Sequence, residues 1–199
     1  MRELIAEYSL AKLQDLPGGD ALWGDFLRLD MVTQEHCGAV AEMSENIARA
    51  KGGSPGDMLD MRRAGLFHDI GKALISKRIV TKPSYLTDLE MMVMRTHTVL
   101  GEQLMRFCGI PYSLMLTACM GHHSLTGSPE YMVDSDPLVL LINLADIFET
   151  RRGQRLYPKP IESSVRIVES MHAEMIDDHK VTLDIWHMFL NGLESMGIV

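Results

Sequence analysis

The stretch YLTDLEMMVMRTHTVLGEQLMRF, residues 85–107, carries the repeat that decides the fold class. Thr87 and Glu90 have the spacing of a capping box, which is typical of a helix N-terminus. Apolar residues follow at helical spacing, and we expect them to form one buried stripe: Leu89, Val93, Leu100, Leu104 and Phe107. The glycine and proline of CGIPY, residues 108–112, then predict the end of the helix. One amphipathic helix is therefore expected here.

Most other periodic segments also repeat at helical spacing, and none alternates convincingly with a period of two. Asp136 and Pro137 have the pattern of an N-cap followed by a first-turn proline, so a helix is expected through LVLLINLADIFETRR. Further helices are expected over residues 3–14, 31–50, 56–68, 113–121, 161–177 and 183–191. The sequence therefore predicts an all-α fold.

Composition narrows the class of protein. A chain of 199 residues that is 46% hydrophobic can bury one sizeable core, so a single domain over residues 1–199 is expected. The net charge of −8 argues against a binder of DNA or RNA, because phosphate backbones are bound mainly by clustered Lys and Arg. No stretch approaches the roughly 18 apolar residues of a membrane span. Three cysteines without a C-x-x-C pair favour a soluble protein of the reducing cytoplasm.

Several histidines and aspartates lie where the pattern predicts burial. His36, His97 and Asp146 lie on the expected inner faces of helices, and the pairs His68-Asp69 and His122-His123 each close a helix. A single buried histidine is usually a core residue with a hydrogen-bond partner. An isolated buried carboxylate costs several kcal/mol unless it is paired or bound to metal. If each of these residues were an ordinary core residue, each would need its own buried hydrogen-bond or ionic partner.

One metal centre would satisfy the whole set, which comprises His36, His68, Asp69, His97, His122, His123 and Asp146. Imidazole and carboxylate ligands in this ratio suit manganese, iron, cobalt, nickel or zinc better than magnesium or calcium. The set exceeds what one tetrahedral ion accepts, so two divalent ions that share Asp69 are expected. Lys72 lies three residues after Asp69 and would reach the same pocket if the helix continues, although a surface lysine would show the same spacing.

The order of these residues resembles the HD superfamily of metal-dependent phosphohydrolases, and the words around them resemble its HD-GYP branch. LFHDIGKALI, LTDLEMMVMRTHTVLGEQLM, HHSLTGSP and ADIFETRRGQRLYPKPI follow that branch from about residue 30 to residue 165. The resemblance implies an all-helical HD-type domain with a dinuclear centre and an activity that hydrolyses cyclic di-GMP or a related cyclic dinucleotide. Residues 1–29 and 166–199 would be helical additions to the metal-binding core.

The resemblance also implies roles for individual residues. One ion would take His36, His68 and Asp146, the other His97, His122 and His123, with Asp69 as a bridge. Iron or manganese is expected, with zinc, cobalt or nickel as alternatives. Lys72 would contact a substrate phosphate and, with Asp69, serve catalysis. Arg155 and Tyr157 match the arginine and tyrosine of the branch's R-P-Y word and are candidate substrate contacts.

The loop after the histidine pair departs from the branch. Ser124 and Thr126 replace the acidic residues of its H-H-E and D-G-x-G-Y-P words, and Gly-Tyr-Pro is shortened to GSP at residues 127–129. These changes affect a loop to which substrate specificity and partner interactions are attributed, and they leave the metal ligands intact. Val32 occupies the position where some members carry a glutamate linked to a third metal, so two ions are expected.

Three functions follow from these observations. The first is a phosphodiesterase that cleaves a cyclic dinucleotide by attack of a metal-bound hydroxide. The second is a phosphohydrolase of another, smaller nucleotide. The third is a catalytically weak module that keeps the metal site and serves as a nucleotide sensor or protein-interaction platform. The sequence is compatible with a signalling-protein partner and with a homodimer. Neither a nucleic-acid polymer nor a membrane is expected as a partner.

Overall fold

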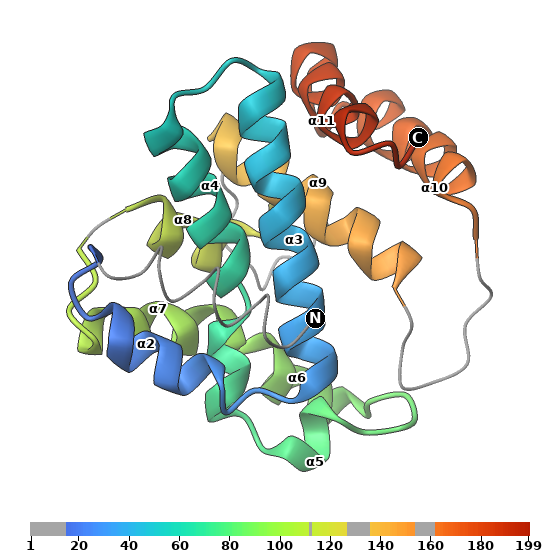
Figure 1. The fold of residues 1–199 in the computed structure, drawn as a ribbon. Coiled ribbons are helices and arrows are strands. Elements are labelled where there is room, and N and C mark those ends of the chain that lie inside the picture. Colours follow the sequence, from blue (N-terminus) through green and yellow to red (C-terminus); the bar gives the residue numbers. More distant parts are fainter. Residues whose placement is uncertain (1–14, 112, 127–135, 154–161) are drawn as a thin grey trace.

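A computed structural model describes residues 15–111, 113–126, 136–153 and 162–199. Helices and connecting turns make up these ranges, and none of their residues forms a β-strand (Figure 1). The expectation of an all-α fold is confirmed. The helix expected over residues 3–14, the GSP loop, Arg155 and Tyr157 lie outside the described residues. No helix in the described ranges is both long enough and apolar enough to span a membrane.

Several helices begin and end close to the predicted positions, and two short ones, over residues 19–26 and 77–80, were not predicted. In chain order they are α2 (Gly19–Phe26), α3 (Met31–Ala50), α4 (Pro55–Phe67), the 3-10 helix η1 (Ile70–Leu74), α5 (Lys77–Val80), α6 (Asp88–Arg95), α7 (His97–Phe107), α8 (Leu114–Gly121), the 3-10 helix η2 (Ser124–Thr126), α9 (Pro137–Arg152), α10 (Ser164–His172), the π-helix η3 (Ala173–Asp177) and α11 (Leu183–Ser195). Side-chain caps explain several of these starts. Asp136 accepts a hydrogen bond from the backbone N–H of Leu138, and Thr87 and Glu90 form the predicted capping box.

The segment 85–107 forms two helices, so the prediction of one continuous helix is wrong. The chain turns at Thr96, whose hydroxyl donates a hydrogen bond to the carbonyl oxygen of Val93. The expected stripe is wrong as well, because Leu89 is 76% exposed and Phe107 is 90% exposed. A change of axis between α6 and α7 explains both results, since residues on either side of the turn no longer share one face. The buried face of α7 instead begins at His97.

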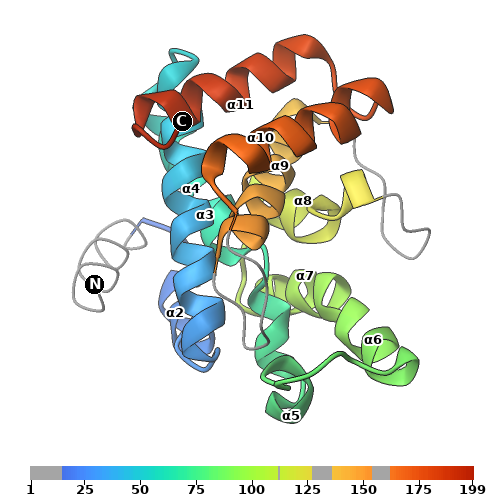
Figure 2. The same cartoon turned by 90° about the vertical axis from the view of Figure 1, so that its right-hand side faces the viewer.

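Helices α3 and α9 form the middle of the molecule. Val40, Met43 and Ile47 of α3 are buried, and α3 packs against α4, α9 and α11. Helix α9 is buried along most of its length, which explains its nearly continuous apolar sequence. Helices α10 and α11 lie on one side of this centre, and α5, α6 and α7 lie on the other (Figure 2). The elements that carry the predicted site therefore converge between two helical groups.

Two glycines bring η1, α7 and α8 together. A Cβ atom at Gly71 would lie 1.9 Å from the carbonyl oxygen of His97, and one at Gly101 would lie 2.5 Å from the Sγ atom of Cys119. Any larger side chain would force these elements apart. The glycine of the HDIGK word is thus required by packing, and it places the residues before η1 next to the start of α7.

Candidate metal centre

The structure brings the predicted ligand residues into one buried cluster. His36 lies on α3, His68 caps the C-terminus of α4, Asp69 precedes η1, His97 begins α7, His122 and His123 follow α8, and Asp146 lies on α9. His68, Asp69, His97, His122 and Asp146 are buried, whereas His36 and His123 are half-buried. Residues from distant parts of the sequence thus meet at the point where the helices converge.

The first group in this cluster consists of His36, His68 and Asp146. The Nε2 atom of His36 lies 3.0 Å from Oδ1 of Asp146, and Nε2 of His68 lies 3.8 Å from the same oxygen. One ligand atom from each residue lies within 4.8 Å of the other two. The three side chains have the types and the spacing of a metal site.

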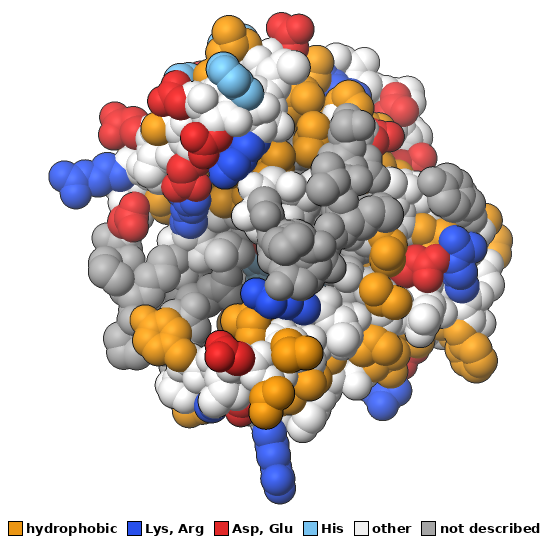
Figure 3. Space-filling view, turned by 180° about the vertical axis from the view of Figure 1, so that it is seen from behind, with side chains coloured by type: hydrophobic (Ala, Val, Ile, Leu, Met, Phe, Trp, Pro, Cys, Tyr) orange, Lys and Arg blue, Asp and Glu red, His pale blue; other side chains and the backbone are white. Residues whose placement is uncertain are grey.

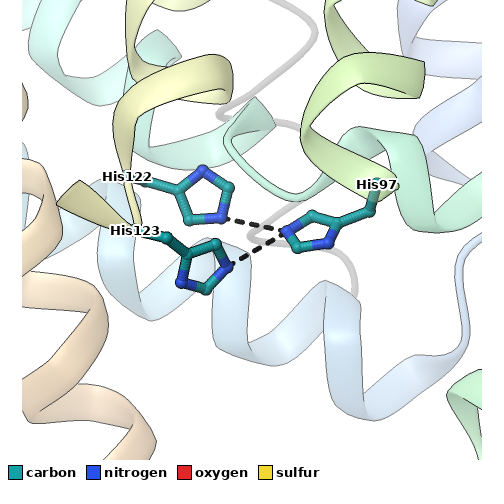
Figure 4. A group of neighbouring side chains, drawn as sticks. All are labelled: His97, His122 and His123. Atoms are coloured by element: carbon teal, nitrogen blue, oxygen red, sulfur yellow. Dashed lines mark hydrogen bonds between the residues drawn. The ribbon is translucent and has the colours of Figure 1, made fainter. Parts of the chain in front are cut away.

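The second group consists of His97, His122 and His123 (Figure 4). The Nε2 atom of His97 lies 3.1 Å from Nε2 of His122 and 3.2 Å from Nε2 of His123. Two nitrogens that bind one ion at about 2.1 Å, with about 90° between them, would lie about 3 Å apart. The three imidazoles therefore have a separation that suits a shared ion.

Backbone contacts fix the ring orientation of three histidines. The Nδ1 atom of His68 lies 2.8 Å from the carbonyl oxygen of Gly65, and Nδ1 of His97 lies 2.7 Å from that of Met94. The Nδ1 atom of His122 contacts the carbonyl oxygens of residues 118 and 119. A carbonyl oxygen only accepts, so each Nδ1 carries the hydrogen. In the neutral rings the Nε2 atoms then present lone pairs to the cluster, as in metal-binding histidines.

The surroundings of these Nε2 lone pairs indicate whether the cluster suits a metal ion. Nε2 of His97 and Nε2 of His122 face each other across 3.1 Å with no hydrogen to share, so a proton or a metal ion has to lie between them. Burial lowers the pKa of His97 to about 4 and holds the pKa of His122 well below its usual value, which disfavours the proton. Nε2 of His68 is buried and has no hydrogen-bond partner among the described residues. A metal ion would satisfy these nitrogens.

Asp69 lies between the two groups. Its Oδ1 atom is 3.2 Å from Nε2 of His97 and 3.7 Å from Nε2 of His122. Its Oδ2 atom is 3.5 Å from Nε2 of His68 and 3.8 Å from Nε2 of His36. Each carboxylate oxygen therefore faces a different group of histidines, which is the arrangement that a bridging ligand requires.

Lys72 reaches the same carboxylate. Its ammonium group contacts Oδ2 of Asp69 from one turn further along the chain, and its side chain is largely buried. Burial by itself would raise the pKa of Asp69, but Lys72 and the surrounding histidines outweigh this effect and hold that pKa well below its usual range. Asp69 is therefore ionised, and Lys72 lies at the centre of the site, as the sequence predicts.

Comparison with known proteins identifies the fold family. The model of the HD domain family matches residues 33–151, which is more than half of the chain. The chain belongs to the HD domain family. This match confirms the resemblance on which the sequence analysis relied.

Curated relatives of this HD domain are cyclic dinucleotide phosphodiesterases. The cyclic di-GMP phosphodiesterase of Thermotoga maritima is 30% identical over 154 residues, which make up 73% of this chain and 42% of that protein. The 3'3'-cGAMP-specific phosphodiesterase 3 of Vibrio cholerae serotype O1 is 32% identical over 153 residues, or 73% of this chain and 33% of that protein. The chain therefore spans less than half of the length of these relatives.

Solved structures confirm the fold at lower identity. The HD domain of the L. monocytogenes phosphodiesterase PgpH superposes with a TM-score of 0.65 at 16% identity, covering 88% of this chain and 96% of that chain. The same domain in complex with cyclic-di-AMP superposes with a TM-score of 0.67 at 17% identity, over 88% and 95% of the two chains. The helical arrangement described above is thus that of an HD domain.

A cavity of about 520 Å³ opens onto the cluster of this HD domain. His36, Asp69, His97, His123 and Asp146 form part of its wall. Apolar side chains line another part, namely Ile79, Val80, Leu86, Met91 and Met94. A pocket of this size, with polar and apolar side chains in its wall, is typical of small-molecule binding sites.

Some cavity residues were not anticipated from the sequence. Thr150 and Arg151 line the cavity, although neither was a candidate site residue from the sequence. Cys37 also lies next to the cluster, because its Sγ atom is within 4.8 Å of ligand atoms of His68 and Asp69. Burial raises the pKa of the Cys37 thiol well above its usual value, so the thiol is neutral in the metal-free protein. Its adjacency to His36 was the signal in the sequence.

Proposed function

We propose that this HD domain is a metal-dependent phosphodiesterase that hydrolyses a cyclic dinucleotide, with cyclic di-GMP as the first candidate. The observation that carries the proposal is the position of Asp69, whose two oxygens face two separate groups of histidines. Two ions a few ångströms apart are a recurring device for phosphodiester hydrolysis. The names of the curated relatives support the substrate class.

The residues of the cluster would hold the two ions. One ion would be bound by His36, His68 and Asp146, the other by His97, His122 and His123, with Asp69 shared. When bound, the ions supply a nucleophile at neutral pH and neutralise charge on the phosphoryl oxygens. Iron or manganese suits this donor set, and zinc, cobalt and nickel accept it as well. The chain contributes a fixed geometry, because three helices and two short connections hold the ligands.

The remaining polar groups would act on the substrate. Lys72 lies beside Asp69 and is positioned to neutralise a phosphate oxygen at the same place. Asp69 keeps the lysine charged, since its carboxylate raises the pKa of Lys72 against the opposing effect of burial. Arg155 and Tyr157 belong to the proposal as further substrate contacts, on the basis of their match to the branch's sequence pattern.

The first test is hydrolysis of cyclic di-GMP by protein reconstituted anaerobically with ferrous or manganous ion. Chromatography would follow the linear dinucleotide and GMP. Replacing the bridging carboxylate in Asp69→Ala is expected to reduce turnover by more than about 100-fold and to lower the metal content. Asp60→Ala is the matched control, because Asp60 is exposed on α4, outside the cluster.

The outcomes separate the hypotheses. Turnover by the wild-type protein and by Asp60→Ala, with loss in Asp69→Ala, supports the phosphodiesterase. Unchanged metal content in Asp69→Ala would contradict the bridging role. Absence of turnover of cyclic di-GMP despite two bound ions would contradict this substrate. A panel of other nucleotides would then distinguish the smaller-nucleotide hydrolase from the sensor, which binds without turnover.

A further inference from the structure

Helix α9 presents one continuous face to the cavity. Asp146, Ile147, Thr150 and Arg151 all line it, at the spacing that places residues on one side of a helix. Asp146 belongs to the proposed metal centre at one end of this face. Arg151 lies at the other end, with its Cα atom about 7.5 Å further along the helix axis. The cavity wall thus carries a cation at the other end of this face from the proposed metal centre.

The C-terminal helices hold this arginine in place. One terminal nitrogen of the guanidinium donates a hydrogen bond to the Ser170 hydroxyl at 3.1 Å, and the other donates to Oε2 of Glu174 at 2.6 Å. Ser170 lies on α10 and Glu174 on the π-helix η3, which directly continues α10 along the chain. A guanidinium has five N–H donors in a rigid plane, so these contacts are compatible with binding a further anion. They reduce the freedom of the side chain before any ligand arrives.

Among the described residues, Lys72 and Lys82 also line the cavity, and each is paired with a carboxylate, as Arg151 is with Glu174. Lys72 contacts Asp69 at the centre of the site. Lys82 pairs with Glu90, whose carboxylate also accepts the N-cap bonds of α6. Acidic and basic side chains are mixed on the surface over α10 and α11, at the upper left of Figure 3. Of these three residues, Arg151 is the one whose side chain forms hydrogen bonds with α10 and η3.

We propose that Arg151 binds the second phosphodiester of a cyclic dinucleotide while the first lies at the metal centre. This inference rests on the proposed function, because a second phosphate matters only for such a substrate. A cyclic dinucleotide carries two phosphodiesters, and only one can lie over the ions at a time. The other then needs a cation of its own on the cavity wall. Arg151 is therefore a specificity-determining residue, which favours cyclic dinucleotides over diesters with a single phosphate.

The test compares two substrates on three proteins. Metal-loaded wild type, Arg151→Ala and Arg152→Ala are assayed with cyclic di-GMP and with bis(p-nitrophenyl) phosphate, which has one phosphodiester. Arg152 is the matched control, because it pairs with Glu149, stacks on Phe148 and is not among the described residues that line the cavity. Circular dichroism verifies that the variants are folded.

We expect Arg151→Ala to raise KM for cyclic di-GMP about tenfold or more, with kcat changed less, since a charge-assisted contact to bound substrate is lost. Its kcat/KM for bis(p-nitrophenyl) phosphate should stay within about twofold of wild type. Glu174→Gln should give a smaller increase of KM, because it loosens Arg151 without removing it. Arg152→Ala should change neither substrate. An equal loss on both substrates in Arg151→Ala, or no change on either, would overturn the inference.

A binding measurement keeps the inference separate from the proposed function. Calorimetry with the bis-phosphorothioate analogue of cyclic di-GMP should show a dissociation constant about tenfold higher for Arg151→Ala than for wild type. If the wild type hydrolyses neither substrate, the proposed function fails, and this comparison still decides the role of Arg151. Equal affinities would overturn that role, and absence of binding to the wild type would overturn both.

Discussion

At the scale of single residues, buried histidines couple stability to pH in the metal-free protein. Burial lowers the pKa of His97 to about 4, whereas an exposed histidine titrates near 6.5. Between these values the unfolded chain takes up a proton that the folded chain does not. Stability therefore rises with pH across this window and falls on acidification. We expect His97 alone to remove about 2 kcal/mol from the free energy of unfolding between pH 7 and pH 5.

Urea unfolding of metal-free protein at the two pH values checks this expectation. His97→Gln should flatten the pH dependence by about the stated amount. His187→Gln is the control, because His187 is exposed on α11, and it should keep the wild-type dependence. Equal stability of the wild-type protein at pH 7 and pH 5 would show that the buried histidines are not held neutral.

At the scale of elements, the contact between η1 and α7 sets the distance between Asp69 and His97. A Cβ at Gly71 would meet backbone atoms of α7 at 1.9 and 2.5 Å, and backbone cannot move aside cheaply. Gly71→Ala is expected to cost about 3 kcal/mol of unfolding free energy and to weaken metal binding, since it separates the two ligands. Gly24→Ala is the matched control, because nothing lies within 4 Å of its Cβ position, and it should be neutral or slightly stabilising.

Thermal unfolding and a metal titration of both variants measure these effects. A stable Gly71→Ala protein with wild-type metal affinity would contradict the role given to this contact.

The helices also show which features of the fold the sequence predicts and which it does not. Residues 31–50 were predicted as a helix and form α3 over the same range, because its apolar residues keep one repeat and Asp30 caps its start. The repeat in 85–107 was equally regular, yet the chain breaks at Thr96. A break changes which residues face inward without changing their spacing. Periodicity identifies helices, whereas the direction of each helix depends on packing against its neighbours.

At the scale of the whole molecule, the proposed ligands tie together elements from α3 to α9. Metal binding should therefore stabilise the fold as a unit. A ligand at about 1,000 times its dissociation constant contributes about 4 kcal/mol. We expect chelation to lower the Tm of the wild-type protein by several degrees. Asp69→Ala should have a Tm that does not respond to added manganese, and a metal-dependent Tm in that variant would contradict the assignment.

The sequence could predict that the proposed ligands cluster, because each is a polar residue within a stretch whose apolar pattern predicts burial. Their positions on expected inner helix faces and at helix ends were the signal in the sequence. Arg151 could not be found in this way, since an arginine at a helix end is usually a solvated residue. Its place in the cavity depends on Glu174 and Ser170, which come from a segment well beyond the metal ligands. Long-range side-chain contacts of this kind leave no local pattern.

The hydrogen bonds that orient His68, His97 and His122 all stay within a single helical turn, because each Nδ1 binds a carbonyl three or four residues earlier. Local backbone contacts therefore set the orientation of these three rings. Parts of the chain more than about one turn away can change in length or composition without altering these contacts. Sequence changes between η2 and α9, such as those in the GSP loop, would therefore leave the orientation of these three proposed ligands unchanged.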